Sequence, residues 1–64
     1  MTEPIISLAI KLTEVQAQAF AEFLKRADPD DFFRRAGDQR EADQMMDAAS
    51  AIRQALNKAG FAPR

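Results

Sequence analysis

Apolar and polar residues alternate at the beginning of the chain. The apolar positions would share one face of an extended segment: Ile6, Leu8, Ile10 and Leu12. The outward face would hold Ser7, Ala9 and Lys11. This period of two predicts a β-strand, and Pro4 marks its start, where a missing backbone donor is tolerated.

The rest of the sequence contains no second strand pattern to pair with this one. Backbone N–H and C=O groups along a strand edge are costly when buried and open to pairing when exposed. We therefore expect the strand to pair between two copies of the chain, giving a homodimer, or with another protein. Ser7, Ala9 and Lys11 are the candidate strand-pairing residues.

Helical spacing of apolar residues follows the strand. A first helix is expected from about Glu14 to Ala27, because Thr13 begins a capping box. A short second helix is expected to begin with Asp28 as its cap and Pro29 at its first position. Gly37 should end this helix in the left-handed conformation that other residues resist.

A third and longer amphipathic helix is expected after Asp38, over about 21 residues. Gly60 should end it, with Phe61 folding back onto Leu56 as in a Schellman motif. The predicted fold is therefore α+β, with one strand and three helices in a single domain of residues 1–64. Its predicted core comprises Ile6, Leu8, Ile10, Leu12, Val15, Phe20, Phe23, Leu24, Met45, Ala49, Ile52 and Leu56.

Composition restricts the chemistry of the chain. The 64 residues are 47% apolar and 30% charged, which is typical of a globular domain, but they include neither Cys nor His. A thiol nucleophile, an imidazole base, a disulfide and the usual ligands of a structural zinc are all excluded. We expect no enzymatic activity and no cofactor, and we expect stability to come from oligomerisation or from unusually good helix packing.

The strand region also bears on location. Ser7 and Lys11 interrupt its apolar residues, and Glu3 precedes it in place of a basic segment. It therefore resembles neither a transmembrane helix nor a signal peptide, and we expect a cytoplasmic protein without a membrane partner.

Acidic residues concentrate between Asp28 and Asp47. One interpretation is structural, with caps, first-turn charges and the i,i+4 pairs Asp30–Arg34 and Asp31–Arg35 accounting for most of them. The other is a surface that binds a basic protein partner. Its candidate residues are Asp30, Asp31, Glu41, Asp43 and Asp47. Asp43 and Asp47 fit the second interpretation best, because they are like charges one turn apart, with only Arg40 near Asp43 and no basic residue at i+4 of either.

A metal site in this acidic region is not expected. An EF-hand loop that began at Asp28 would place Phe32 and Ala36 at ligand positions, and Gln39 where the loop requires Glu.

Two pairs of neighbouring apolar residues leave alternatives open. Phe32 and Phe33 are about 100° apart on a helix, so one of them should be exposed as a candidate aromatic anchor for a partner. Met45 and Met46 suit either a core or an adaptable binding surface. A flank of small residues on the third helix allows a close neighbour, either the first helix or a second subunit: Ala48, Ala51 and Ala55.

The order of strand, capped helix and longer helix resembles ribbon-helix-helix transcription regulators over the first 27 residues or so. In that family two chains pair their strands in the major groove of DNA. This chain departs from the family pattern, because its outward strand face has the single charge of Lys11 and the net charge is −1. DNA binding by a homodimer is therefore the alternative function.

The whole chain, including its Ala59-Gly60-Phe61-Ala62-Pro63-Arg64 ending, resembles short acidic proteins of bacterial phages and other mobile elements. Some of these are anti-CRISPR inhibitors. The resemblance implies a non-enzymatic inhibitor or adaptor that covers a basic or nucleic-acid-binding surface of its target. The acidic residues would meet that surface, with Phe32 or Phe33 as the anchor.

Overall fold

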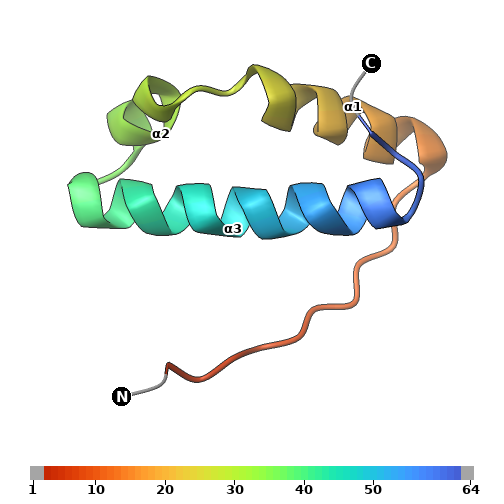
Figure 1. The fold of residues 1–64 in the computed structure, drawn as a ribbon, viewed down its shortest axis with the longest axis horizontal. Coiled ribbons are helices and arrows are strands. Elements are labelled where there is room, and N and C mark those ends of the chain that lie inside the picture. Colours follow the sequence, from red (N-terminus) through yellow and green to blue (C-terminus); the bar gives the residue numbers. More distant parts are fainter. Residues whose placement is uncertain (1–2, 63–64) are drawn as a thin grey trace.

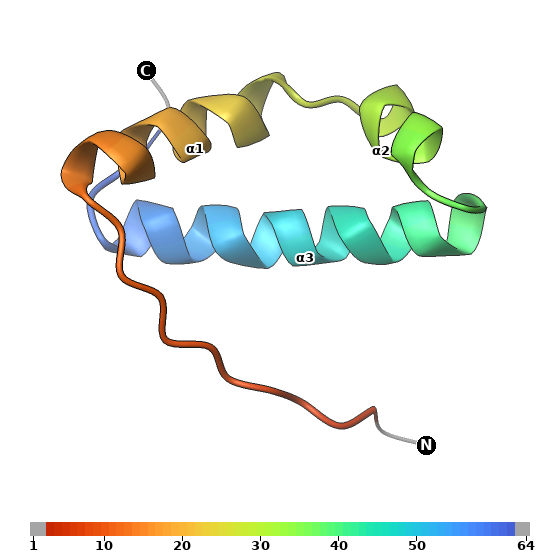
Figure 2. The same ribbon diagram turned by 180° about the vertical axis from the view of Figure 1, so that it is seen from behind.

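The computed structural model describes residues 3–62 and contains three helices in that range. They are α1 (Glu14–Arg26), α2 (Pro29–Arg35) and α3 (Gln39–Lys58). Figure 1 shows α1 and α2 following one another along one side of α3, with α1 running antiparallel to it. The same arrangement seen from behind shows the segment before α1 leaving on the opposite side of α3 (Figure 2).

The prediction of a strand is wrong for the part of the chain that the structure describes. Residues 3–12, here called the arm, form neither helix nor strand, and the α+β assignment is replaced by an all-helical fold. Ile6, Leu8 and Ile10 are 78%, 73% and 69% exposed. The physical reason is the absence of a pairing partner. A strand is held by hydrogen bonds to a neighbouring strand, and residues 3–62 of this single chain contain no second strand to supply them.

Capping residues begin all three helices as predicted. The Thr13 Oγ1 atom accepts from the Gln16 backbone N–H at 3.1 Å, and the Gln16 Oε1 atom accepts from the Thr13 N–H at 3.0 Å. Asp28 forms the equivalent box at α2, with Pro29 at the first helical position. At α3 the Asp38 carboxylate accepts from a backbone N–H three residues later. These contacts connect residues close in sequence, which explains why the pattern located them.

The two predicted glycine endings have different outcomes. At α3 the Schellman motif is confirmed, because Gly60 has φ 97° and the Phe61 N–H donates to the Leu56 carbonyl at 2.9 Å. At α2 the prediction is wrong, because Gly37 does not have a positive φ. Ala36 caps that helix with an extended backbone, so the chain leaves α2 without a left-handed residue.

The buried core of the described residues is small. It comprises Ala17, Ala21, Leu24, Ala42 and Leu56. Of the predicted core, Leu24 and Leu56 are buried, and Met45 and Ala49 are half-buried. The remaining predicted core residues are exposed, which corrects their assignment: Ile6, Leu8, Ile10, Leu12, Val15, Phe20, Phe23 and Ile52. Alanines stand where α1 and α2 meet α3, and many of the larger side chains lie beside those contacts.

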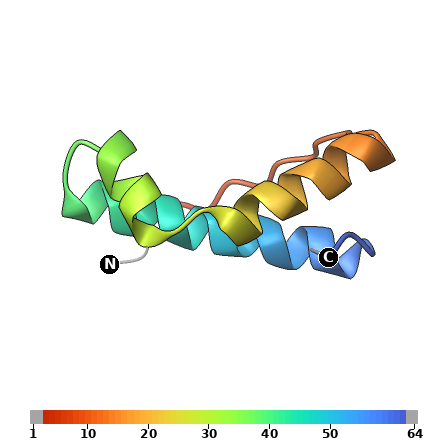
Figure 3. The ribbon, with the colours of Figure 1, turned by 90° about the horizontal axis from the view of Figure 1, so that it is seen from above.

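The shape of the molecule explains this small core. Its extents are 33 × 27 × 14 Å, and Figure 3 shows the helices seen along the thin layer that they form. Because α1 and α2 follow one another along α3 and neither is stacked on the other, the layer is one helix deep (Figure 1). Each helix can bury only the side that meets its neighbour, and both faces of the layer remain open.

Candidate functional site

Several exposed apolar residues of α1 and α3 lie on the same face of the layer, although Val15, which is 79% exposed, stands on a different side of α1. Successive residues of a helix are rotated by about 100°, so each side chain has a direction relative to the buried side of its helix. Phe20 and Phe23 on α1 point about 60–130° away from the mean direction of the buried residues of α1. Ala48 and Ile52 on α3 are displaced from the buried residues of α3 by similar angles and in the same sense of rotation. Because α1 faces α3 and runs antiparallel to it, these two sides coincide in space (Figure 1). We call this surface the apolar face.

A hollow on the apolar face joins all three helices. It has a volume of about 550 Å³ and is lined by Ala19, Phe23, Ala27, Phe32 and Met45, together with the charged residues Arg26, Asp31 and Arg35. Its walls are therefore apolar and its charges are of both signs. Such a surface suits a contact that combines apolar packing with ion pairs at its margin.

Aromatic rings dominate the α1 side of this face. Phe20 and Phe23 are stacked, with ring centroids 5.6 Å apart and an interplanar angle of 18°. Phe23 is nevertheless 55% exposed. An aromatic pair in this geometry is held in place by its own contact, so it presents a rigid apolar surface to solvent.

Small apolar residues continue the apolar face along α3. They form a stripe of exposed residues: Ala48, Ile52, Ala55 and Ala59. The small-residue flank of the sequence prediction, Ala48, Ala51 and Ala55, is exposed throughout, so α1 is not the neighbour that covers it. Ile52, the largest side chain of the stripe, is 43% exposed.

The two phenylalanines of α2 differ in their exposure to solvent. Phe33 is 50% exposed, whereas Phe32 is half-buried and lines the hollow. Phe33 is therefore the aromatic side chain of α2 that is available as an anchor. Met45 also lines the hollow and, like Met46, is half-buried.

Several acidic candidates have structural roles. The Asp28 backbone N–H donates to Asp31 Oδ2 at 2.9 Å, and the Arg34 guanidinium donates to Asp31 Oδ1. The backbone hydrogen bond, and after it the contact with Arg34, hold the pKa of Asp31 below its usual value. Glu41 accepts from the Gly37 backbone N–H at 3.0 Å.

The predicted pairs of Asp30 with Arg34 and of Asp31 with Arg35 do not form. Arg34 instead pairs with Asp31, three residues before it. Within residues 3–62, Asp30 makes no hydrogen bond or ion pair of its side chain. No group of three acidic side chains there could hold a metal ion. The acidic candidates are thus separate groups and not one cluster.

Asp43 and Asp47 lie toward the outer edge of α3, on the side that points away from α1. At about 100° per residue, they stand about 120° and 160° from the mean direction of the buried residues of α3, rotated away from Ile52. Both are exposed. Asp43 Oδ1 accepts from the neutral Gln39 amide at 2.8 Å, and the Asp47 carboxylate has no hydrogen bond or ion pair within the described residues. We call this pair the acidic flank.

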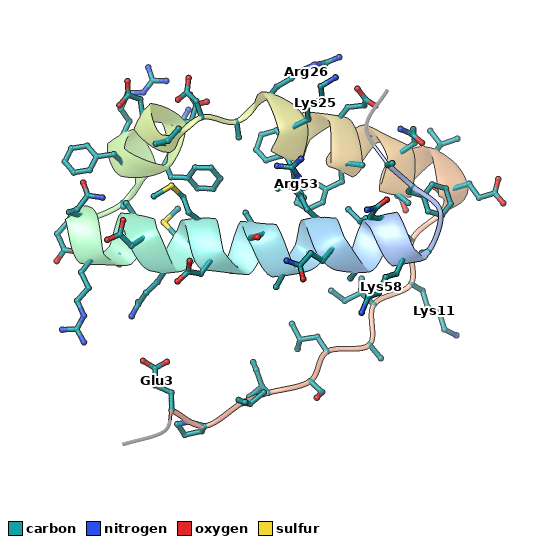
Figure 4. All side chains as sticks on the ribbon, viewed as in Figure 1. Glu3, Lys11, Lys25, Arg26, Arg53 and Lys58 are labelled. Carbon is teal, nitrogen blue, oxygen red and sulfur yellow. The ribbon has the colours of Figure 1, made fainter. Side chains whose placement is uncertain are left out.

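The candidate pairing residues of the arm are separate from both of these surfaces. Ser7, Ala9 and Lys11 are exposed, and Figure 4 shows Lys11 pointing away from the helices. The same view shows Arg53 pointing from α3 toward α1. Arg53 lines a second, more polar hollow of about 230 Å³ with Ser50, Gln54 and Asn57.

Sequence reasoning missed both the apolar face and this polar hollow. The sequence did contain a signal for the apolar face, because Phe20, Phe23 and Ile52 all stand beside the buried alanines of their helices in helical rotation. Their size led to their assignment to the core.

No helix within residues 3–62 is long and apolar enough to cross a membrane.

One comparison with known proteins gives a match. A family described as a family of unknown function (DUF7706) matches residues 1–64. No curated protein and no solved structure matches the chain.

Proposed function

This chain belongs to the DUF7706 family, whose function is unknown, and we propose that it is a non-enzymatic protein-interaction module whose acidic flank binds a basic surface of another protein. By covering that surface it would act as an inhibitor or an adaptor. The observation that carries this proposal is the acidic flank itself, two exposed aspartates one helical turn apart that form no ion pair within residues 3–62.

Among the described residues, these two aspartates make no ion pair that stabilises the fold. Like charges at i,i+4 destabilise a helix by a few tenths of a kcal/mol. Asp31, Asp38 and Glu41 offset their charge by accepting backbone hydrogen bonds near helix starts, whereas Asp43 and Asp47 accept none from the backbone that the structure describes. Two carboxylates on a rigid helix are well suited to an Arg-rich or Lys-rich surface, because they steer association and fix its register.

Direct binding to DNA is less well supported by the same observations. The arm contributes a single cation, Lys11, and the acidic flank would repel phosphates. The two functions therefore predict opposite effects of removing the aspartates: loss of a protein partner in one case, and unchanged or stronger DNA binding in the other.

The test uses the full chain, immobilised and exposed to a lysate of its source cells, with bound proteins identified by mass spectrometry. We expect a basic protein to be retained at about 50 mM salt and released at about 500 mM, because exposed charges are screened over that range. The variant Asp43→Asn/Asp47→Asn should retain roughly tenfold less of it, since two exposed ion pairs are lost at up to about 1 kcal/mol each.

A charge-matched control variant, Glu3→Gln/Glu14→Gln, removes two carboxylates elsewhere and should retain the partner fully. Circular dichroism should show the same helix content for all three proteins. Equal retention by both double variants would contradict the proposal. Retardation of a random duplex DNA by the chain at about 50 mM salt, reduced by Lys11→Ala, would support the regulator function instead.

A further inference from the structure

The apolar face has no counterpart within the chain. Protein domains are built from two or more layers packed around a core, because a helix with an apolar side must bury it against another element. This chain forms one layer 14 Å deep, with five buried residues among those the structure describes. With neither Cys nor His, it also lacks the covalent and metal cross-links that stabilise other small domains.

The exposed area of the chain shows how much surface a second layer would cover. A compact monomer of 7.1 kDa is expected to expose about 4,100 Å². This chain exposes 5726 Å², an excess of about 1,600 Å² over that expectation. A standard interface takes about 800 Å² from each partner, and obligate homodimers take more. The excess is therefore large enough for an obligate dimer.

We propose that the apolar face is an interface between two copies of this chain, packed face to face about a two-fold axis, with the arms included in the contact. Each copy supplies the layer that the other lacks. The inference goes beyond the proposed function, because it uses a different side of α3 and does not involve the basic partner.

The residues of the hollow suit contact with a copy of itself. In a two-fold contact the same patch lies on both sides, so a patch with charges of one sign would repel its copy. The margin of this hollow has Arg26 and Arg35 as well as Asp31. Asp31 already pairs with Arg34, so an ion pair between copies would have Asp31 share its carboxylate with a second cation. Between these charged residues lie the stacked phenylalanines and the stripe of small residues on α3, which allow the two copies to approach closely.

The arm supplies the remaining apolar surface. Ile6, Leu8 and Ile10 are each more than two-thirds exposed, and they stand at alternate positions of an extended backbone. Such residues lie about 6.7 Å apart on one side of the segment, comparable to the 5–6 Å between turns of a helix. A row with this spacing can pack along helices of the second copy.

The test measures the mass of the full chain in solution by sedimentation equilibrium between about 1 and 100 μM. We expect twice the monomer mass at the upper end and a melting temperature that rises with concentration, because a second copy binds only the folded state. A monomer mass at 100 μM together with a concentration-independent melting temperature would overturn the proposal.

Matched variants on α3 locate the interface. Ile52→Asp places a charge in the apolar face, and we expect it to weaken dimerisation at least 100-fold. Ser50→Asp adds the same charge two residues away, beside the polar hollow, and should leave the dimer intact. A dimer that tolerates Ile52→Asp as well as Ser50→Asp would exclude this face.

A variant of the arm tests its part in the contact. Leu8→Asp/Ile10→Asp should weaken the dimer without removing any buried residue of the monomer, and an unchanged dissociation constant would exclude the arm. The acidic-flank variant Asp43→Asn/Asp47→Asn should remain dimeric. Loss of the basic partner and loss of the dimer are therefore distinguishable results.

Discussion

Individual carboxylates in this protein differ in what surrounds them, although the sequence presents them as one acidic run. Asp31 accepts a backbone hydrogen bond and pairs with Arg34, and its pKa is lowered, with the Asp28 backbone as the larger cause. Asp47 has no such contacts among the described residues. Contacts within three residues of Asp31 explain its role, so charge alone is a poor guide to function here.

The lowered pKa of Asp31 predicts a pH dependence of stability. Because its folded pKa lies below the unfolded value, near 3.8, its stabilising effect is complete above that value and is lost as the pH falls through the folded pKa. Asp31→Asn should therefore destabilise the protein at pH 7 and differ progressively less from wild type in more acidic solution. Urea unfolding between about pH 2 and 7 measures this difference.

Arg34→Ala provides the control for this prediction. It keeps the hydrogen bond from the Asp28 N–H and removes the lesser cause of the shift, so part of the pH dependence should remain. Parallel stability curves for wild type and Asp31→Asn across the acidic range would show that the Asp31 carboxylate has no such role.

At the scale of the elements, helix boundaries follow from local chemistry. Each N-cap accepts from a backbone N–H three residues later, and the end of α3 is closed by Gly60 and Phe61. The Gln18 amide also donates to the Ala62 carbonyl at 3.0 Å, which ties the end of α3 to α1. The Schellman ending thus contributes to tertiary structure as well as to the helix.

The two glycines provide a matched test of these endings. Gly60→Ala should destabilise the protein by about 1 kcal/mol, because φ 97° is unfavourable for alanine although nothing lies within 4 Å of the added carbon. Gly37→Ala should be neutral or stabilise by up to about 1 kcal/mol, because φ is not positive there and the nearest atom is 3.8 Å away. Denaturant unfolding distinguishes them, and equal costs would contradict the assignment.

These elements also show how much the sequence could predict. The caps and the end of α3 were predictable, because each depends on a few neighbouring side chains. The strand was not, since a period of two shows an extended backbone with two different sides but does not supply a second edge. The core was only partly predictable, because helical spacing marks an apolar side without showing whether Ala17 or Phe20 meets the neighbouring helix. Asp43 and Asp47 form no ion pair among the described residues, although Asp43 accepts a hydrogen bond from Gln39, and the function of the acidic flank remains a prediction.

The whole molecule combines a thin helical layer with an exposed arm. The arm has no secondary structure, and its apolar side chains face solvent. Ordering this segment against a second copy would reduce both its exposure and its freedom to enter the active site of a protease. Accessibility of the arm therefore reports on assembly.

Limited digestion with trypsin tests this at the level of the whole molecule. Lys11 lies on the arm, whereas Lys25 and Lys58 lie on helices, so cleavage after Lys11 should come first. Its rate constant should fall by about tenfold as the protein concentration rises from about 1 to 100 μM, because dimerisation covers the arm. A rate constant that is independent of concentration, or first cleavage within α3, would contradict this view of the arm.

The 20-residue helix α3 carries the stripe of small residues and the acidic flank on two different sides. A straight helix about 30 Å long keeps these two sides in a fixed relation. A dimer joined through the stripes would therefore hold two acidic flanks, facing outward, at a set separation. Such an assembly is bivalent, and on a target with repeated basic sites its second contact would form at a high effective concentration. Weak single contacts by Asp43 and Asp47 could then support tight binding to an array, and much weaker binding to an isolated site.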